Sequence, residues 1–236
     1  MARKTINRKI LEEIKKEEPM GVGEESNCYF LKGTSDIIKI YFQHKRLSDI
    51  KFDDKKSLYI AFPKDVLVDE ETNEIVANTM SYLPGEKIFN GFPREIEISN
   101  LKEAYNVLSQ EIQKFSDIYM VDLCLDNILF DLGSNRFYII DTGRWHELPD
   151  VSALNQARID INLSSALYNS GLSWLKDYPN LKEENPKLYD FFITSKDVRY
   201  CPFLEFLDTL ILELETKFNQ EVKTIGDLIP KTFKKS

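Results

Sequence analysis

The first third of the chain contains short apolar runs separated by polar turns, which is typical of β-strands. The runs NCYFLKG and DIIKIYF are rich in β-branched and aromatic residues, and a short polar turn separates them. A second pair of apolar runs lies in DVLVDEETNEIVANTMSYL, on either side of the polar stretch EETNE. We therefore expect two β-hairpins between residues 20 and 85.

Two segments of this part have helical spacing instead. In residues 1–18 the side chains of Ile10, Leu11 and Ile14 share one face, which predicts an N-terminal helix that ends by Pro19. Residues 46–62 predict a second, short helix. Its apolar stripe would be formed by Leu47, Ile50, Leu58 and Ala61.

The pattern changes after LPGEK, so we expect a hinge near residues 81–86. A stripe with i, i+3, i+4 and i+7 spacing then predicts a long helix. Its members are Leu101, Ala104, Tyr105, Leu108, Ile112 and Phe115. Asn100 and Glu103 have the spacing of a capping box at the start of this helix.

The rest of the chain predicts one small hairpin and two more helices. The hairpin would turn at DLGSN, and the helices would cover residues 152–170 and 201–218. Strands followed by helices favour an α+β fold with two lobes. We place the β-rich N-terminal lobe in residues 1–85 and the helical C-terminal lobe in residues 86–236.

The composition limits the possible classes of protein. The chain has 236 residues, of which 42% are hydrophobic, and it contains no apolar run near the roughly 18 residues of a membrane span. A net charge of −8 argues against broad nucleic-acid binding. The three cysteines (Cys28, Cys124 and Cys201) are far apart, and two histidines make a zinc site improbable. We expect a soluble, cytoplasmic protein that binds neither nucleic acid nor membranes.

Short polar residues stand at the ends of apolar runs in residues 119–143, YMVDLCLDNILFDLGSNRFYIIDTG. They are Asp122, Asn127 and Asp141, and they are either turn residues or groups that meet around something positively charged. Upstream, IIKIY places Lys39 in the middle of a predicted strand. A lysine there is costly to bury unless it meets an anion.

Several of these motifs occur in the order found in the protein kinase-like superfamily. DLCLDN fits the pattern D-L-x-x-x-N of the catalytic loop, and Asp141 ends an apolar strand in an Asp-x-Gly sequence. GVGEESNCY is similar to the Gly-rich loop, with Gly21 and Gly23 in place and Ser26 at the third glycine. Over residues 20–170 the chain thus resembles a small, divergent member of this superfamily.

The resemblance implies a phosphotransferase that uses ATP with Mg²⁺ or Mn²⁺. In it, Asp122 would accept or orient the proton of the attacking hydroxyl, and Lys39 would hold the α- and β-phosphates. Asn127 and Asp141 would bind the metal ion. The remaining cofactor-binding positions would be Gly21, Gly23 and Ser26 over the phosphates, with Met80 and Tyr82 of the connector TMSYLPG on the adenine side.

The chain departs from the family pattern at several positions. Met120 and Val121 replace the His and Arg before the catalytic Asp, Cys124 replaces a lysine, and no Ala-Pro-Glu follows Gly143. The helix glutamate that normally pairs with the strand lysine has no obvious equivalent. Helical phase over residues 46–62 suggests Asp54 for this place, with Asp53 as the second choice.

Three functions remain open on this basis. The first is a protein Ser/Thr kinase, and the second is a small-molecule kinase of the aminoglycoside type, which the short segment after Gly143 favours. The third is a pseudokinase that binds nucleotide or a partner without transfer. The phosphoacceptor, whether a protein or a small molecule, is not identified by the sequence.

Overall fold

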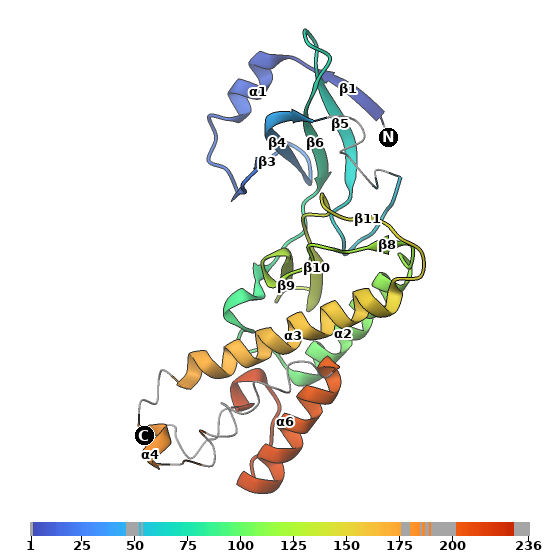
Figure 1. Ribbon diagram of the computed structural model, residues 1–236. Coiled ribbons are helices and arrows are strands. Elements are labelled where there is room, and N and C mark those ends of the chain that lie inside the picture. The colour runs from blue at the N-terminus through green and yellow to red at the C-terminus, as the bar shows by residue number, and fades with distance from the viewer. Residues whose placement is uncertain are drawn as a thin grey trace. The chain divides into compact units, whose positions relative to one another are not determined.

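The computed structural model divides the chain into two compact units, and each is described by itself (Figure 1). The first unit comprises Met1–Pro84 and Ile139–His146, and the second comprises Gly85–Tyr138 and Glu147–Ser236. Within them the structure describes residues 2–45, 52, 54–175, 180–184, 186, 189 and 202–228.

A six-stranded sheet forms the first unit, in the order β1-β5-β6-β4-β3-β2. Its strands are β1 (Ala2–Ile6), β2 (Gly21–Val22), β3 (Ser26–Phe30), β4 (Asp36–Lys45), β5 (Pro63–Asp69) and β6 (Ile75–Ser81). All neighbours are antiparallel except β1 and β5, which are parallel. The two predicted hairpins are therefore confirmed as β3–β4 and β5–β6.

One face of this sheet carries the main apolar core of the first unit. Because side chains alternate between the faces of a strand, Ile38 and Ile40 point to one side of β4 and Lys39 to the other. Ile38 and Ile40 pack with Ala77 of β6 and with Leu11 of the helix α1 (Arg8–Ile14). Lys39 consequently lies on the face that α1 does not cover.

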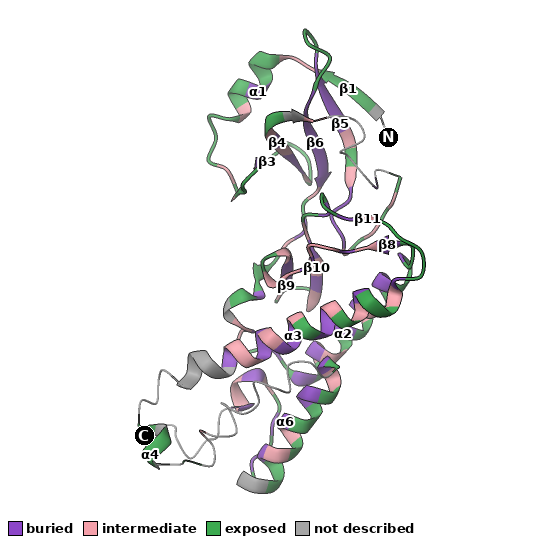
Figure 2. Cartoon of the chain, in the orientation of Figure 1, coloured by how far each residue is buried: buried purple, intermediate pink, exposed green. Residues whose placement is uncertain are grey.

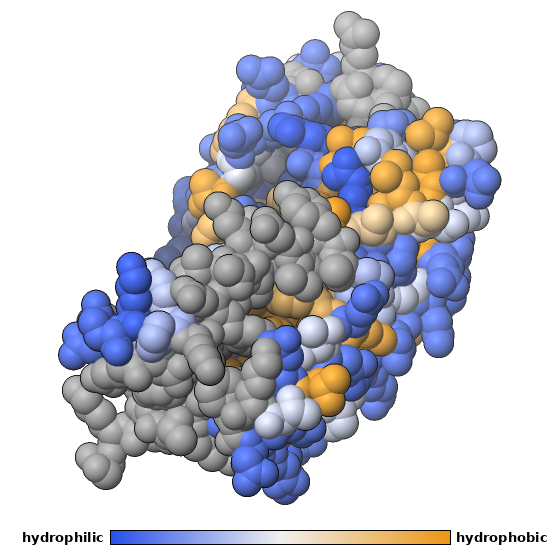
Figure 3. All heavy atoms as spheres, turned by 60° about the horizontal axis from the view of Figure 1, so that its bottom comes forward, coloured by the Kyte–Doolittle hydropathy of each residue, from blue (hydrophilic) through white to orange (hydrophobic). Residues whose placement is uncertain are grey.

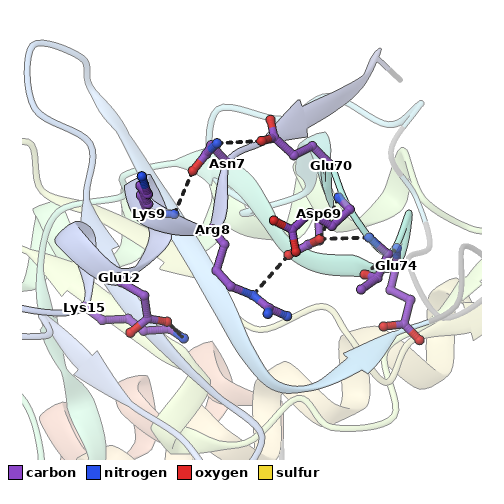
Figure 4. A network of polar contacts seen from close by, with 10 residues as sticks. Asn7, Arg8, Lys9, Glu12, Lys15, Asp69, Glu70 and Glu74 are labelled. Atoms are coloured by element: carbon purple, nitrogen blue, oxygen red, sulfur yellow. Dashed lines mark hydrogen bonds and ion pairs between the residues drawn. The ribbon is translucent and has the colours of Figure 1, made fainter.

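The predicted N-terminal helix is present as α1, but it covers only part of the segment of residues 1–18. Residues 2–6 form β1, because their backbone groups find hydrogen-bonding partners along the edge of β5. Asn7 then caps α1 by accepting a hydrogen bond from the N–H of Lys9, at 2.8 Å. Figure 4 shows how Arg8 fixes this helix to the sheet, with its Nε 3.5 Å from the buried carboxylate of Asp69.

The short helix predicted over residues 46–62 is wrong where the structure describes it. Residues 54–59 have turn and irregular conformations, and residues 46–51 and 53, with the second-choice Asp53, lie outside the described residues. Leu58, expected to face inward, is 78% exposed, whereas Phe52 is buried. Phe52 packs edge-on against Phe62, and contacts of this kind outweigh local helical spacing here.

In its described residues, the second unit contains three long helices and a small sheet. The helices are α2 (Ile98–Gln113), α3 (Ser152–Leu175) and α6 (Phe203–Phe218), with the short α4 (Leu181–Glu184) and the 3₁₀ turns η2 (Ile88–Asn90), η3 (Leu125–Asn127) and η5 (Ile225–Leu228). Its strands are β7 (Glu86–Lys87), β8 (Ile118–Tyr119), β9 (Ile128–Asp131) and β10 (Arg136–Ile139), and β11 (His146–Glu147) lies where the chain passes between the units. The sheet order is β10-β9-β7, and α3 packs against both α2 and α6.

These elements confirm the predicted α+β class, with a β-rich N-terminal part and a helical C-terminal part. The three long predicted helices and the hairpin at DLGSN are present. The capping box is wrong, since α2 begins at Ile98 and Asn100 lies inside it. The Ile98 N–H instead donates to the Lys223 carbonyl at 2.8 Å, so a segment distant in sequence satisfies the helix start.

Burial divides the long helices into two faces. Figure 2 shows buried and exposed residues alternating around α2 and α6, as expected of amphipathic helices. Among the residues coloured in Figure 3, hydrophilic side chains predominate, and hydrophobic ones are visible at several places. Within the part of the chain that the structure describes, no helix is both long and apolar enough to cross a membrane.

A glycine at the start of the second unit permits a close backbone contact. Gly85 has φ +121°, and a Cβ there would lie 2.9 Å from the backbone of Phe130. No other residue type tolerates both the conformation and the approach. The connector can therefore pass directly beside β9, where Glu86 pairs with Phe130.

Tyr105 joins α2 to α3, and we expect its loss to destabilise the fold. Its hydroxyl donates to Asp160 at 2.7 Å, and burial followed by this bond raises the pKa of Tyr105 to about 12. Tyr105→Phe should lower the free energy of unfolding by about 1–3 kcal/mol, because Asp160 loses a buried donor. Chemical denaturation at neutral pH measures this difference.

The same residue predicts a pH dependence. A raised pKa means that the folded state favours the neutral hydroxyl. The neutral hydroxyl therefore contributes fully to stability below its usual pKa near 10, and this contribution is lost as pH rises through about 12. Over this range the wild type should lose more stability than Tyr105→Phe. Parallel stability curves for the two proteins would contradict the assignment.

Candidate functional site

Lys39 lies in the middle of β4, as the sequence predicts. In the register of the sheet it stands opposite Cys28 on β3 and Asn78 on β6. Its side chain is only 16% exposed, so its charge needs a partner. Burial raises the pKa of the neighbouring Cys28 thiol, which favours the neutral form of that thiol.

The partner of Lys39 is Asp141, which follows the end of β10. The Lys39 Nζ lies 2.8 Å from Asp141 Oδ1, and both residues belong to the first unit. Asp141 has φ +58°, an uncommon conformation for a residue other than glycine but one that Asp tolerates. Its side chain is 49% exposed, so the carboxylate is held at Lys39 while remaining accessible.

Asp54 does not take the place predicted for it. It lies in a turn and is exposed, and the helical phase that assigned it to Lys39 is absent from the described residues around it. Among the described residues, the ion pair of Lys39 is made with Asp141. Lys39 and Asp141, predicted to act on phosphates and metal respectively, are therefore in direct contact.

The predicted Gly-rich loop is a tight β2–β3 turn. Gly21 pairs with Cys28, and the Gly23 N–H donates to the Ser26 carbonyl at 2.9 Å. Ser26 is buried at the start of β3. The turn carries two acids, and Glu25 pairs with Lys45 at 2.9 Å, which lowers the pKa of that carboxyl.

Met80 and Tyr82 stand at the end of β6 and just after it. Met80 is buried and pairs with Ile37 of β4. Ile37 stands two residues before Lys39, so these two side chains lie on the same face of β4. Tyr82 is half-exposed, and its ring packs edge-on against Phe30 with centroids 4.9 Å apart. Both positions thus adjoin the strands that carry the predicted nucleotide-binding residues.

Asp122 and Asn127 lie together in the second unit. Asp122 is in the turn after β8, and Asn127 ends η3. The Asn127 Nδ2 donates to the Asp122 carbonyl at 2.9 Å, so one predicted site residue fixes the backbone of the other. The carbonyl oxygen of the Asn127 side chain takes no part in this bond.

Three side chains of α3 hold this loop, and sequence reasoning did not identify them. Buried Asn155 accepts from the Met120 N–H and donates to the Ile118 carbonyl, at 3.1 and 2.7 Å. Arg158 and Asn162 donate to the carbonyls of residues 121 and 123, at 2.8 and 3.0 Å. Their spacing of i, i+3 and i+7 places them on one helix face, a polar stripe that was visible in the sequence.

Asp160, another polar residue of α3, has a different role. Its Oδ1 accepts hydrogen bonds from the Tyr105 hydroxyl and from the Phe203 N–H, at 2.7 and 3.2 Å. It therefore joins α2 and the first turn of α6 to α3. Asn155, Arg158 and Asn162 hold the loop instead.

The predicted metal ligands have suitable chemistry. Within the described residues, His, Cys, Asp and Glu side chains form no group of three or more that could hold a metal ion. Mg²⁺ usually takes only one or two protein oxygens, together with phosphate oxygens and water. Asp141, in the first unit, offers an accessible carboxylate of this kind, and Asn127, in the second unit, offers an amide oxygen.

Comparison with known proteins gives little direct guidance. No family model matches the chain, and no curated protein matches it. Among solved structures, it is similar to the kinase PK-1 of the Cydia pomonella granulovirus, with 19% sequence identity and a TM-score of 0.43. The similarity covers 59% of this chain and 58% of that one. By itself, a likeness at this level decides neither fold nor activity.

Proposed function

We propose that this protein is a kinase-like phosphotransferase that uses ATP with Mg²⁺ or Mn²⁺, and that its acceptor is a protein Ser/Thr hydroxyl. The observation that carries the proposal is the contact of Lys39 with Asp141. A mostly buried lysine in mid-strand meets a half-exposed carboxylate at 2.8 Å. An ammonium group that could bind phosphate therefore lies beside a carboxylate that could bind a metal ion. This pairing suits a triphosphate, which needs both a cation and a metal ion.

Residues of the first unit would bind the nucleotide. The Lys39 ammonium holds the α- and β-phosphates, and the turn from Gly21 to Ser26 covers them. Met80 and Tyr82 contribute apolar surface on the adenine side. Because these side chains sit on strands of one sheet, their spacing is set before nucleotide arrives, and less ordering is needed on binding.

Residues of the second unit would handle the acceptor. Asp122 accepts or orients the proton of the attacking hydroxyl, in the manner of a general base. Asn127 holds the Asp122 backbone, and α3 holds the same loop through Asn155 and Arg158. A loop fixed at so many points keeps the base in one orientation, as positioning catalysis requires.

Asn127 and Asp141 would hold the metal ion. When bound, the ion neutralises charge on the phosphates during transfer. Asp141 would do so while in contact with Lys39, since only its Oδ1 is engaged by the lysine. The carboxylate therefore orients the phosphate-binding lysine as well as offering an oxygen to the metal.

A pseudokinase that binds nucleotide or a partner without transfer is the second candidate, and the acidic turn favours it over a kinase because it disfavours a bound triphosphate. Glu24 and Glu25 lie where the loop would cover a triphosphate, and like charges repel there. The charge of Glu25 is offset by Lys45, whereas the side chain of Glu24 is 92% exposed and its Oε2 lies 4.0 Å from the Arg144 guanidinium.

A small-molecule kinase is the third candidate, because only eight residues separate Gly143 from the start of α3 at Ser152.

Incubation of pure protein with γ-labelled ATP and Mg²⁺ or Mn²⁺ tests the proposal. Label on serine or threonine of the protein itself, or of an added protein substrate, supports the leading candidate. Transfer to an aminoglycoside alone supports a small-molecule kinase. Nucleotide binding without any turnover supports the non-catalytic candidate, and the absence of both nucleotide binding and turnover contradicts every candidate that uses nucleotide.

Asp141 should account for the metal-dependent part of nucleotide binding. In the wild type, ATP at 100 times its dissociation constant should stabilise the fold by about 2.7 kcal/mol, and by less when EDTA removes the metal. Asp141→Ala should abolish that difference, because the metal loses a charged ligand. Melting curves with ATP plus Mg²⁺ and ATP plus EDTA measure the effect.

Two further variants make this measurement decisive. Asp141→Asn keeps a side chain that tolerates φ +58°, so it separates loss of charge from backbone strain. Asp208→Ala removes an exposed aspartate of α6 that pairs with Lys102, and it should behave as the wild type. An undiminished Mg²⁺ effect in both Asp141 variants would remove this residue from the site.

A further inference from the structure

The segment that carries Asp141 is attached to the first unit just before this residue. Ile139 forms a parallel bridge with Ile60. The Ile139 N–H donates to the Tyr59 carbonyl at 2.8 Å, and the Ala61 N–H donates to the Ile139 carbonyl at 2.9 Å. Two residues before Asp141, the backbone is therefore fixed on both sides.

A second attachment follows directly after Asp141. The buried Thr142 hydroxyl donates to the Ala61 carbonyl at 3.3 Å, and the Trp145 N–H donates to the Thr142 carbonyl at 3.1 Å. Residues 142–145 thus form a closed turn. Trp145 has no exposed surface, and its ring meets Phe62 edge-on with centroids 6.0 Å apart.

Packing holds Trp145 in this place. Its indole N–H is buried and has no hydrogen-bond partner within the described residues. Its contact with Phe62 extends to Phe52, whose ring centroid lies 6.3 Å from that of Phe62. An indole in such a cluster buries a large apolar area, which is enough to fix the end of a short turn.

Asp141 lies between these two attachments in a conformation that needs support. A non-glycine residue with φ +58° persists only where its surroundings determine it. Its carboxylate is half-exposed and forms an ion pair with Lys39. The attachments at Ile139 and at Trp145 therefore hold the backbone on both sides of the residue that carries this carboxylate.

We propose that Trp145 is a positioning residue for Asp141. By closing the turn after Asp141 and anchoring it on Phe62, the indole holds the carboxylate at Lys39 and in the orientation that receives the metal ion. This inference rests on the proposed function and deepens it. The orientation of the metal ligand Asp141 would depend on Trp145, a residue that itself contacts neither the metal ion nor the nucleotide.

A magnesium titration of nucleotide-induced stabilisation tests this role without measuring turnover. In Trp145→Leu, the Mg²⁺ concentration that gives half of the ATP-dependent melting shift should rise about 10–100-fold, the usual effect of removing a residue that supports a metal ligand. Trp145→Phe keeps an aromatic ring in the cluster and should restore most of the wild-type value.

A matched control separates positioning from general destabilisation. Phe137→Leu removes a buried aromatic ring of β10 that packs with Phe92 and Phe130 in the second unit. It should lower the melting temperature by a similar amount and leave the half-saturating Mg²⁺ concentration unchanged. Equal changes in this value for Phe137→Leu and Trp145→Leu would overturn the inference.

The remaining outcomes distinguish the two proposals. A wild type with a Mg²⁺-dependent shift that Trp145→Leu leaves unchanged overturns the role of Trp145 alone. A wild type with no Mg²⁺-dependent shift overturns the proposed function, and the positioning role with it.

Discussion

Asp122→Asn should lower phosphoryl transfer by about 10²–10⁴-fold, the usual scale for a lost general base, while nucleotide affinity stays the same. The amide has nearly the same shape as the carboxylate but cannot accept the proton. Asn127 bonds to the backbone carbonyl of Asp122, so the loop should keep its conformation in the variant. Transfer of γ-labelled phosphate and ATP-induced melting shifts, measured on the same preparations, separate the two effects.

A neighbouring acid supplies the control. Asp126→Asn changes an exposed residue of the same loop, whose carboxylate lies 3.9 Å from Lys87, and it should retain wild-type transfer. Equal rates in wild type and Asp122→Asn would indicate a contaminating kinase or a different base. Parallel losses of transfer and of nucleotide binding in Asp122→Asn would point to a disturbed loop rather than to lost proton transfer.

The elements that could be predicted are those in which the pattern of apolar residues in the sequence reflects which side chains are buried. The strands β3–β6 are recognisable by apolar runs that line the core of the sheet, and α2 and α6 show regular stripes because each buries one face. Lys39 was recognisable for a related reason, since a lysine in the middle of such a strand requires an anionic partner. The strand pattern and the cost of burying a charge both indicated Lys39.

The failures occurred where distant segments decide the conformation. The charged run at residues 2–6 shows no alternation, yet it forms β1 because β5 offers it an unpaired edge. Leu58 fits a helical stripe in sequence and is 78% exposed in the structure, because Phe52 and Phe62 bury their rings against each other instead. Local periodicity contains no information on such partners.

The candidate site was predicted in part for the same reasons. Motif spacing proposed Asp122, Asn127, Asp141 and Lys39, and the structure brings Lys39 to Asp141 and Asn127 to the Asp122 backbone. The acid expected to contact Lys39 was placed on a helix that the described residues lack. The side chains that support the site, Asn155 and Trp145 among them, act through backbone contacts and packing. Motifs describe the residues that touch a ligand, whereas supporting residues emerge only once the fold brings them together.

Lys39→Met is the second variant with a large expected effect. Removing the ammonium should lower transfer by about 10²–10³-fold, the scale of losing one group that stabilises developing charge, and should also weaken ATP binding. The fold should be retained, because the ion pair with half-exposed Asp141 contributes only about 0–1 kcal/mol to stability. Transfer rates and ATP-dependent melting shifts measure the two effects.

Lys45 provides the matched control on the same strand. Its side chain is 25% exposed and pairs with Glu25 at 2.9 Å, so Lys45→Met also removes a half-buried, paired lysine from β4. This variant should retain most transfer activity if only Lys39, which stands opposite Asn78 in the sheet, binds the phosphates. Comparable losses in Lys39→Met and Lys45→Met would mean that the net charge of the sheet, and not a specific lysine, supports nucleotide binding.

The contact between Lys39 and Asp141 predicts how their losses combine. Residues that touch are not independent, and coupling energies of about 0.5–3 kcal/mol are usual for such pairs. Asp141→Asn weakens the hold on Lys39 as well as on the metal ion, so adding Lys39→Met to it should lower transfer by less than the product of the two single effects. Multiplicative effects would show that the two residues act separately, and the 2.8 Å ion pair would then be a structural contact without a role in the reaction.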